Sequence, residues 1–460
     1  MSSDVAARGR SGAGARSPRS CVVVGAGPAG LSAAWWLQRH GVRTVVLEAA
    51  AEVGGRTRSV RVHGSTLNLG AAFLASFYDQ TLALCRALEL PLVSPRVHPT
   101  RAGAQRVMAT PRGYVPYAPG SLRGFVRFSL VPARQRLRLL RELVSLARGP
   151  ALHIADHHSL RSVDDVDARS WAVERFGQEV CDYFVRPAIE PFFYMRAEEV
   201  SAGVARALLR HAVHWSIVTP RAGMGALCAA LAAPLDVQRG CRVQSIRRES
   251  RAVEIHHERG CARADAVVLA VPAPDLLAIE GGTTTSRERA EVAGARFEPC
   301  IIALMGYSHP VALPAPSVTI GGAGPHALVG ATALSRGGVP GHISAGEEVV
   351  SVLAMGWRSR ALLACDDDAI VAELRRDVSN LGFTLPDPAW HLVVAREQAT
   401  VIPEPGFTRR LHRLASLPRE RVHLAGDWLT GSSTVEGAVR SGLAAAGAVV
   451  GNAGRAERVA

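Results

Sequence analysis

A glycine-rich turn between a short apolar run and a helix-prone segment most constrains what this chain can fold into. The run Cys21–Val24 leads into the spacing Gly25-x-Gly27-x-x-Gly30, and a second apolar run ends at Glu48. A strand, a Gly-x-Gly-x-x-Gly turn, a helix, a second strand and an acid about 20 residues on form a dinucleotide-binding βαβ unit. We therefore predict an α/β fold in which Glu48 accepts hydrogen bonds from ribose hydroxyls.

Each glycine of this turn has its own predicted task. Gly25 allows the tight bend, Gly27 lets a pyrophosphate approach the backbone, and Gly30 lets the helix pack closely on the strand. Pro28 and Ala29 lie within this turn, and the helix-prone segment Leu31–His40 follows, with the N-terminus of the helix facing the phosphates.

A second glycine element follows soon after Glu48, in the sequence Gly54-Gly55-Arg56. Two glycines and a permanent cation suit a second approach to the same pyrophosphate. The run from Val22 to Ser59 resembles the N-terminus of the flavin-containing amine oxidase superfamily, which includes protoporphyrinogen oxidases, phytoene desaturases and monoamine oxidases. The resemblance implies that the cofactor is FAD and that the Gly-Gly-Arg element contacts it.

The far end of the chain resembles the closing motif of the same superfamily. There Gly426-Asp427 follows an apolar run, and Thr434 precedes a segment expected to be helical. Asp427 is placed to accept a hydrogen bond from a sugar-like hydroxyl, and the amides after Thr434 would point at the flavin. Between the ends, the resemblance assigns the backbone of Val243 to the adenine.

These patterns together give a set of expected cofactor contacts. They are Gly25, Gly27, Pro28, Ala29, Gly30, Glu48, Gly54, Gly55, Arg56, Val243, Gly426, Asp427, Thr434, Val435 and Glu436. Covalent members of the superfamily carry FAD on a cysteine near the C-terminus, and no cysteine follows Cys365 here, so we expect non-covalent FAD.

The expected architecture is a Rossmann-like FAD-binding domain of the glutathione-reductase type, interleaved with a mixed sheet and a helical substrate-binding domain. Residues 1–20 are expected to form a disordered basic tail. The FAD-binding domain is assigned to residues 21–80, 220–288 and 397–453. A mainly helical, substrate- or membrane-facing insert covers 81–219, and a sheet with helix covers 289–396.

The charge composition excludes several mechanisms. The chain has 53 basic and 40 acidic residues, and every basic residue is arginine. A lysine base or Schiff base is therefore excluded. Nucleic-acid binding is disfavoured because no zinc-finger or ribonucleoprotein motif is present and aromatic residues make up only 5% of the chain.

One strongly basic stretch has the composition of a helix that contacts a membrane surface. From Ser121 to Arg148 seven arginines stand against Glu142 alone, and Leu137, Leu140 and Val144 share one helical face. Such a helix suits the surface of an anionic membrane, or it is simply a helix with one solvated basic face. With no signal-length apolar run and no stretch approaching a membrane span, we expect a cytoplasmic protein, in peripheral membrane contact on the first interpretation.

Two further patterns imitate functional sites. Gly322-x-Gly324 with Glu347 copies the dinucleotide spacing, but the glycines from Gly337 to Gly341 interrupt the expected helix, which indicates a hairpin. The histidine groups are His157-His158, His211 with His214, and His256-His257. They lack a supporting carboxylate or cysteine spacing, so no metal site is expected.

The resemblance leaves three functions open. The first is an FAD oxidase or desaturase that takes hydride from a small, largely apolar substrate such as a porphyrinogen or isoprenoid and is reoxidised by dioxygen. The second is an amine oxidase, although that branch usually holds a lysine near the flavin. The third is a prenyl-protein binder like the Rab escort proteins, which the intact glycine and Gly-Asp motifs disfavour. No catalytic residue can be named from the sequence.

Overall fold

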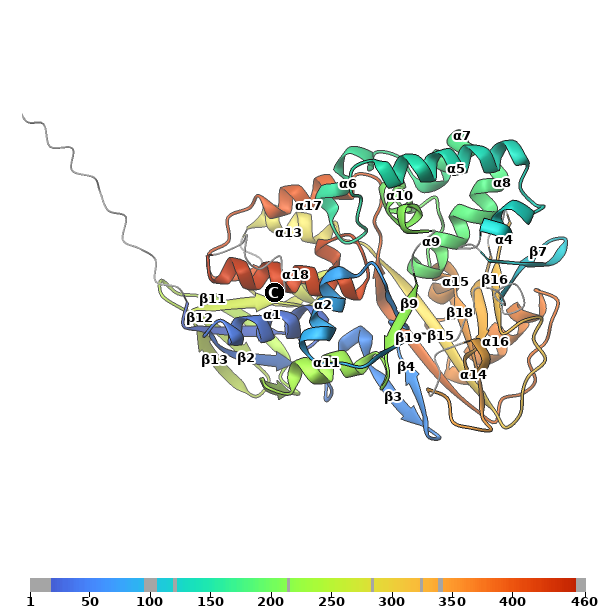
Figure 1. The fold of residues 1–460 in the computed structure, drawn as a ribbon. Helices are drawn as coiled ribbons and strands as arrows, with labels where there is room; N and C mark the ends of the chain where they lie inside the picture. The colour runs from blue at the N-terminus through green and yellow to red at the C-terminus, as the bar shows by residue number, and fades with distance from the viewer. Residues whose placement is uncertain are drawn as a thin grey trace, which may run out of the picture.

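The computed structural model describes residues 18–94, 106–118, 122–212, 216–282, 285–322, 326–337 and 342–451. The first 17 residues of the predicted basic tail lie outside this part of the chain. Figure 1 shows two sheet-containing halves side by side, with a group of helices along the top of one half.

The first half is built on a five-stranded parallel sheet in the order β10-β2-β1-β14-β20. Its strands are β1 (Ser20–Val24), β2 (Arg43–Glu48), β10 (Asp236–Arg239), β14 (Ala266–Leu269) and β20 (Val422–Leu424). The inner strands β1, β2 and β14 are rich in valine because both faces of a parallel sheet are covered, whereas the edge strand β10 is polar and largely exposed. This sheet confirms the predicted α/β fold with a Rossmann-like unit at its centre.

The two faces of this sheet are filled by alternate residues of the same strands. Val23, Val46 and Val268 pack toward the helices α1 (Pro28–Arg39) and α18 (Val435–Val449). Val22 and Leu269 pack toward a three-stranded antiparallel sheet, hereafter the cover sheet. The cover sheet consists of β11 (Val243–Arg248), β12 (Val253–His257) and β13 (Gly260–Ala264). Side chains of a strand alternate between faces, so one apolar strand serves both layers.

Short elements connect the parallel sheet to the rest of the chain. They are η1 (Gly55–Thr57), β3 (Ser59–Val62), β4 (Ser65–Asn68), β5 (Leu74–Ala75), α2 (Asp79–Ala87), β6 (Leu92–Val93), β9 (Ile217–Pro220), α11 (Gly225–Ala232), α12 (Ala273–Ala278), α13 (Ser286–Ala293), α17 (Phe407–Ala415) and η4 (Asp427–Leu429). Strand β9 pairs with both β5 and β6, which ties the start of the insert to its end.

The second half is a seven-stranded sheet in the order β19-β15-β18-β17-β16-β7-β8. Its members are β7 (Arg106–Thr110), β8 (Gly113–Pro116), β15 (Phe297–Tyr307), β16 (Ser317–Ile320), β17 (Leu328–Ala333), β18 (Glu348–Ala354) and β19 (Trp390–Val401). All pairs are antiparallel except β7 with β16, so the sheet is mixed as expected. The nearby helices are α14 (Leu334–Gly337), α15 (Gly356–Leu362) and α16 (Asp367–Ser379).

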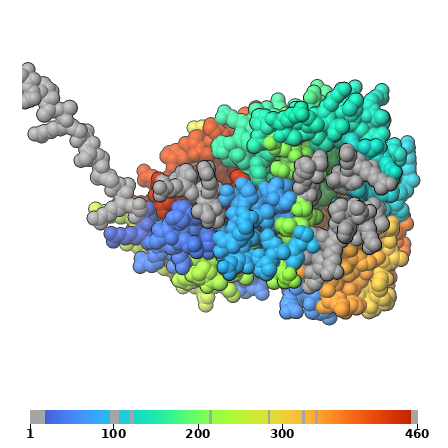
Figure 2. Space-filling model, in the orientation of Figure 1, coloured from blue at the N-terminus to red at the C-terminus, as the bar shows by residue number. Residues whose placement is uncertain are grey.

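The helical insert forms the upper surface in Figure 2. It contains α4 (Leu122–Arg127), α5 (Ala133–Arg148), α6 (His157–Leu160), η2 (Arg161–Val163), α7 (Ala168–Phe176), α8 (Gln178–Val180), η3 (Cys181–Val185), α9 (Arg186–Phe193) and α10 (Ala202–His211). No helix among the described residues has the length and apolar character needed to cross a membrane.

Two features refine the predicted division of the chain. Strands β7 and β8, inside the segment expected to be mainly helical, complete the seven-stranded sheet. Strand β19 runs across the expected boundary between residues 396 and 397. The end of this strand therefore reaches the segments that were predicted to bind FAD.

Substituting Gly442 tests the contact between α1 and α18. In the interior of α18, Gly→Ala alone would stabilise the helix by about 1 kcal/mol. Here a Cβ would lie 2.1 Å from the Ala29 carbonyl oxygen and 2.4 Å from the Ser32 hydroxyl. We expect Gly442→Ala to lower the free energy of unfolding by about 1–3 kcal/mol, because the helices must separate. Urea denaturation followed by circular dichroism measures it.

The exposed position Ala444 of α18 provides the matched control. Ala444→Gly reports helix propensity alone, with an expected loss of about 1 kcal/mol. A Gly442→Ala protein as stable as the parent would contradict the proposed close packing.

Candidate functional site

The glycine turn between β1 and α1 has the geometry that phosphate binding requires. Gly25 has φ +100°, and a Cβ there would lie 2.6 Å from the Ala270 carbonyl oxygen. A Cβ on Gly30 would lie 1.9 Å from the Gly25 carbonyl oxygen, so both positions need glycine for packing. Gly27 differs, because nothing lies within 4 Å of a Cβ built on it. The open side of the turn is therefore at Gly27, the residue predicted to meet the pyrophosphate.

Glu48, at the end of β2, lies against this turn. Its carboxylate accepts hydrogen bonds from the backbone N–H of Ala26 (2.6 Å) and of Ala50 (2.8 Å). Each carboxylate oxygen has a second lone pair available for a ribose hydroxyl. The same carboxylate thus fixes the loop and is positioned beside the open face of Gly27.

The second glycine element lies next to the first. The backbone N–H of Gly54 donates to the Ala26 carbonyl (2.8 Å), and a Cβ on Gly55 would lie 3.5 Å from the Cα of Gly27. Gly54 and Gly55 have φ +113° and +51°, a region that favours glycine. The two glycine elements therefore pack against each other, with Gly25 and Gly27 partly exposed and Gly55 exposed; residues 25–30 and 54–55 are hereafter called the glycine cradle.

Arg56 joins the glycine cradle to the other end of the chain. Its Nη2 lies 2.6 Å from Asp427 Oδ1, and its Nη1 donates to the Ala399 carbonyl at 2.8 Å. The Asp427 side chain is 6% exposed and that of Arg56 29% exposed. Three N–H groups of the guanidinium are not used by these two contacts. Arg56 and Asp427 were predicted as separate cofactor contacts, and the structure brings them together as an ion pair.

Gly426, Thr434 and Val435 frame the start of α18. Gly426 has φ +143° and donates its N–H to the Ser441 hydroxyl at 2.8 Å, which fastens the turn to α18. The Thr434 hydroxyl accepts from the Gly437 N–H at 3.0 Å, so Thr434 caps the helix. Val435 is buried. The remaining N-terminal amides of α18 give this end a partial positive charge.

Glu436 has a different environment from the other predicted contacts. Its fully buried carboxylate accepts from the backbone N–H groups of Gln80 (3.2 Å) and Thr81 (2.8 Å) at the start of α2. It also pairs with Arg440 at 2.7 Å. Burial raises the pKa of Glu436 to about 7. A contact between Glu436 and a cofactor would therefore use its backbone, since the side chain fastens α2 to α18.

Val243 begins β11 and is buried. The register between β11 and β12 shifts between Val243 and Ser245, which leaves an irregular backbone at this point. The preceding Cys241 N–H donates to the Glu48 carbonyl at 2.8 Å, so the start of β11 lies beside the end of β2. The assignment of Val243 to adenine stays a prediction.

The end of β19 is a part of the site that the sequence did not reveal. The Ala399 carbonyl holds Arg56, the Thr400 hydroxyl donates to the Phe193 carbonyl (2.9 Å), and the Val401 N–H donates to the Ser433 hydroxyl (2.5 Å). Three consecutive residues thus connect the glycine cradle, the end of α9 and the start of α18. The β-branched run Thr400-Val401-Ile402 before Pro403 was the available signal.

The segments whose sequences resemble a second dinucleotide motif or a metal site are structured differently. Strands β16 and β17 pair antiparallel on either side of Gly322, so this segment joins a hairpin, as predicted. Gly324, His214 and residues 338–341 lie outside the described residues. Asp79, His153 and Glu436 lie close enough to suggest a metal site, but the Arg440 guanidinium already pairs with both carboxylates.

Comparison with known proteins shows the family to which the chain belongs. The family model described as flavin containing amine oxidoreductase matches residues 28–450. The chain belongs to this family. As a member of the flavin-containing amine oxidoreductases it is an oxidoreductase whose cofactor is FAD. The residues fit this cofactor, because the glycine cradle leaves backbone exposed at Gly27 and Arg56 retains donors beside it.

The curated relatives match only parts of the chain. Mycobacterium tuberculosis AofH, provisionally named a flavin-containing monoamine oxidase, is 35% identical over 152 residues, 33% of this chain and 31% of that protein. Mitochondrial protoporphyrinogen oxidase of Nicotiana tabacum is 26% identical over 179 residues, 38% of this chain and 32% of that protein. The matched region thus spans about a third of these relatives.

The solved structures match over almost the whole chain. A triple mutant of putrescine oxidase superposes with a TM-score of 0.75 over 94% of this chain and 99% of that one, at 18% identity. At this identity the likeness shows the fold alone, and it confirms the predicted interleaved architecture.

Removing the guanidinium of Arg56 tests the site. We expect Arg56→Ala to lower the fraction of purified protein that retains FAD at least tenfold, because the predicted phosphate contact is lost and Asp427 is left buried without its partner. Arg56→Lys keeps the charge without the planar fork and should retain an intermediate amount. The absorbance ratio of flavin to protein after gel filtration measures this.

Arg61→Ala, which removes an exposed arginine from nearby β3, is the control and should retain FAD as the parent does. Full flavin retention by Arg56→Ala would rule out the pyrophosphate assignment.

Proposed function

We propose that the protein is an FAD-dependent oxidase or desaturase that removes hydride from a carbon of a largely apolar substrate, such as a porphyrinogen or an isoprenoid. FAD, when bound, supplies the acceptor for the hydride and passes the electrons on to dioxygen. The cofactor is held without a covalent bond in this proposal, since Cys365, the last cysteine in the sequence, precedes β19 and the whole C-terminal motif.

The observation that carries the proposal is the aromatic end of α9 beside β19. Phe193 and Phe192 belong to this end, and the hydrogen bond between Thr400 and the Phe193 carbonyl links it to the strand that holds Arg56. Phe192 meets Phe73 edge to face, with ring centroids 5.7 Å apart. The Phe193 side chain is fully buried, so the half-buried rings of Phe192 and Phe73, from two separate segments, supply an apolar wall near the predicted cofactor site.

Glu190 of α9 and Glu198, which follows this helix, do not offer a free anion to an ammonium substrate. Glu190 lies 3.2 Å from Arg186, and Glu198 pairs with the same guanidinium. Burial raises the pKa of Glu190 to about 7, so its charge is further reduced near neutral pH. These two carboxylates are therefore already paired and are not available to an ammonium group.

The chain's own residues bind and orient in this proposal. The glycine cradle and Arg56 hold the phosphates, Glu48 and Asp427 fix hydroxyl groups, and the aromatic wall excludes water from the reacting carbon. We assign no general base, because hydride loss from an electron-rich carbon does not require one.

The alternative is an amine oxidase on the same fold. It is favoured by the relative provisionally named a monoamine oxidase, which is 35% identical over the region it shares with this chain. The absence of lysine from the sequence weighs against it, since that branch usually holds a lysine near the flavin.

An anaerobic reduction screen separates the two. We expect a porphyrinogen or a polyprenyl compound to bleach the flavin absorbance of the FAD-loaded protein in a stopped-flow mixing experiment, and primary amines to leave it unchanged. Bleaching by amines alone would overturn the preference. Protein reduced by dithionite and then exposed to air is the control that the bound flavin is competent.

We also propose that α5 rests on an anionic membrane surface. Its buried face contains Gln135, Leu139, Glu142 and Leu146, whereas Leu137 (48% exposed), Leu140 (40%) and Val144 (40%) face outward. Arginines at positions 134, 138, 141 and 148 flank these apolar residues, and all four are exposed. An exposed apolar stripe with basic flanks suits the boundary between headgroups and acyl chains.

Polar substitution on α5 tests this contact. We expect the triple variant Leu137→Ser, Leu140→Ser, Val144→Ser to lose at least tenfold in binding to vesicles of mixed anionic and zwitterionic lipid, because the buried apolar area is lost. Vesicle co-sedimentation measures it. Trp357→Gln, which removes another exposed apolar residue from α15, should bind as the parent does. Equal binding by the triple variant would contradict the proposal.

A further inference from the structure

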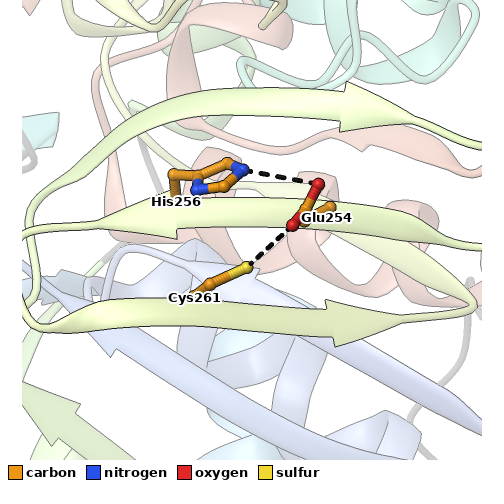
Figure 3. Close-up of side chains that lie close together, drawn as sticks. All are labelled: Glu254, His256 and Cys261. Atoms are coloured by element: carbon orange, nitrogen blue, oxygen red, sulfur yellow. Dashed lines mark hydrogen bonds and ion pairs between the residues drawn. The ribbon is translucent and has the colours of Figure 1, made fainter.

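Three potential metal ligands meet on the outer face of the cover sheet. Glu254 and His256 are alternate residues of β12, so their side chains leave the strand on the same face. Cys261 of β13 is the direct cross-strand partner of His256. Figure 3 shows the three side chains converging above the hairpin.

The distances between these groups match those between ligands of one ion. His256 Nε2 lies 3.4 Å from Glu254 Oε2, and Cys261 Sγ lies 3.4 Å from Glu254 Oε1. All three ligand atoms lie within 4.8 Å of one another. A tetrahedral Zn²⁺ with bonds of about 2.0–2.3 Å separates its ligand atoms by about 3.3–3.8 Å. Small side-chain rotations therefore suffice to place an ion among them.

The ligand atoms are also available. Cys261 is a free, exposed cysteine. His256 Nε2 is shielded from solvent and has no hydrogen-bond partner among the described residues. The Glu254 carboxylate lies near it, at 3.4 Å. Arg263, the cross-strand neighbour of Glu254, is held 2.6 Å from Glu249, so its charge is paired. The Asp79, His153 and Glu436 group differs in this respect, because Arg440 occupies it.

We propose that Glu254, His256 and Cys261 form a binding site for Zn²⁺, outside the cofactor cleft, with the fourth coordination position open to water. A thiolate, an imidazole and a carboxylate are the ligand set that a borderline-soft divalent cation prefers. Binding forms the Zn–S, Zn–N and Zn–O bonds, the Cys261 thiol proton passes to solvent, and no electrons are transferred.

The ion would join β12 to β13 across their hairpin. Strand β13 leads through Asp265 into β14, and Ala270 just beyond β14 packs against Gly25 of the glycine cradle. A ligand that binds only the folded state stabilises it by mass action. Zinc is therefore expected to stabilise the cofactor-binding half without touching the flavin.

Two exposed cysteines give the experiment an internal control. Cys261 lies in the proposed site, whereas Cys365 is exposed and belongs to no cluster of metal ligands among the described residues. The FAD-loaded full-length protein is treated with iodoacetamide with and without added Zn²⁺, and labelling of each cysteine is followed by peptide mass spectrometry. We expect zinc to slow labelling of Cys261 at least tenfold and to leave Cys365 unchanged.

Single substitutions identify the ligands. His256→Ala and Glu254→Gln should remove the protection of Cys261, whereas His257→Ala, on the opposite face of β12, should retain it. Zinc should also raise the Tm of the parent and not of Cys261→Ser. Equal labelling with and without zinc, equal protection of Cys365, or protection that survives in His256→Ala would each overturn the proposal. Flavin content, measured in parallel, keeps this result separate from the proposed function.

Discussion

The ion pair between Arg56 and Asp427 is the interaction on which the arrangement of the predicted cofactor site depends. It joins residues that are 371 positions apart, and the same guanidinium also holds the Ala399 carbonyl at the end of β19. One side chain therefore positions the glycine cradle, the C-terminal turn and the strand that reaches the aromatic wall. Losing the Arg56 charge leaves the Asp427 carboxylate buried without its partner, which is costlier than losing an exposed ion pair.

Local patterns predicted the motifs, and tertiary packing decided how they meet. The glycine turn, Arg56 and Asp427 could be found because spacing and residue type carry their chemistry. The pairing of Arg56 with Asp427 could not be predicted, because it depends on the tertiary arrangement that brings η1 next to the turn after β20. The same reason hid Cys261: only the antiparallel register of β12 with β13 places it opposite His256.

Helix α5 shows where periodicity misleads. An apolar stripe on a helix usually faces the core. In α5 the apolar stripe at Leu137, Leu140 and Val144 faces outward instead, and two polar residues, Gln135 and Glu142, are buried. Both have partners there, Glu179 for Gln135 and Arg175 for Glu142 at 2.9 Å, so their burial leaves no unmet hydrogen bond. Whether a polar residue finds such a partner is decided by distant segments of the chain.

The strand order of the parallel sheet has a consequence for how the protein is made. Strands β1 and β2 leave the ribosome first, but their sheet is finished only by β20, and α18 covers α1 later still. A nascent chain must therefore keep the apolar face of α1 and the free edge of β14 from aggregating until the last segment emerges. A chain interrupted before residue 422 would have the glycine cradle but lack Asp427, so on the predicted role of Asp427 it would fail to load flavin. Such a product would stay colourless and would be a ready substrate for proteolysis.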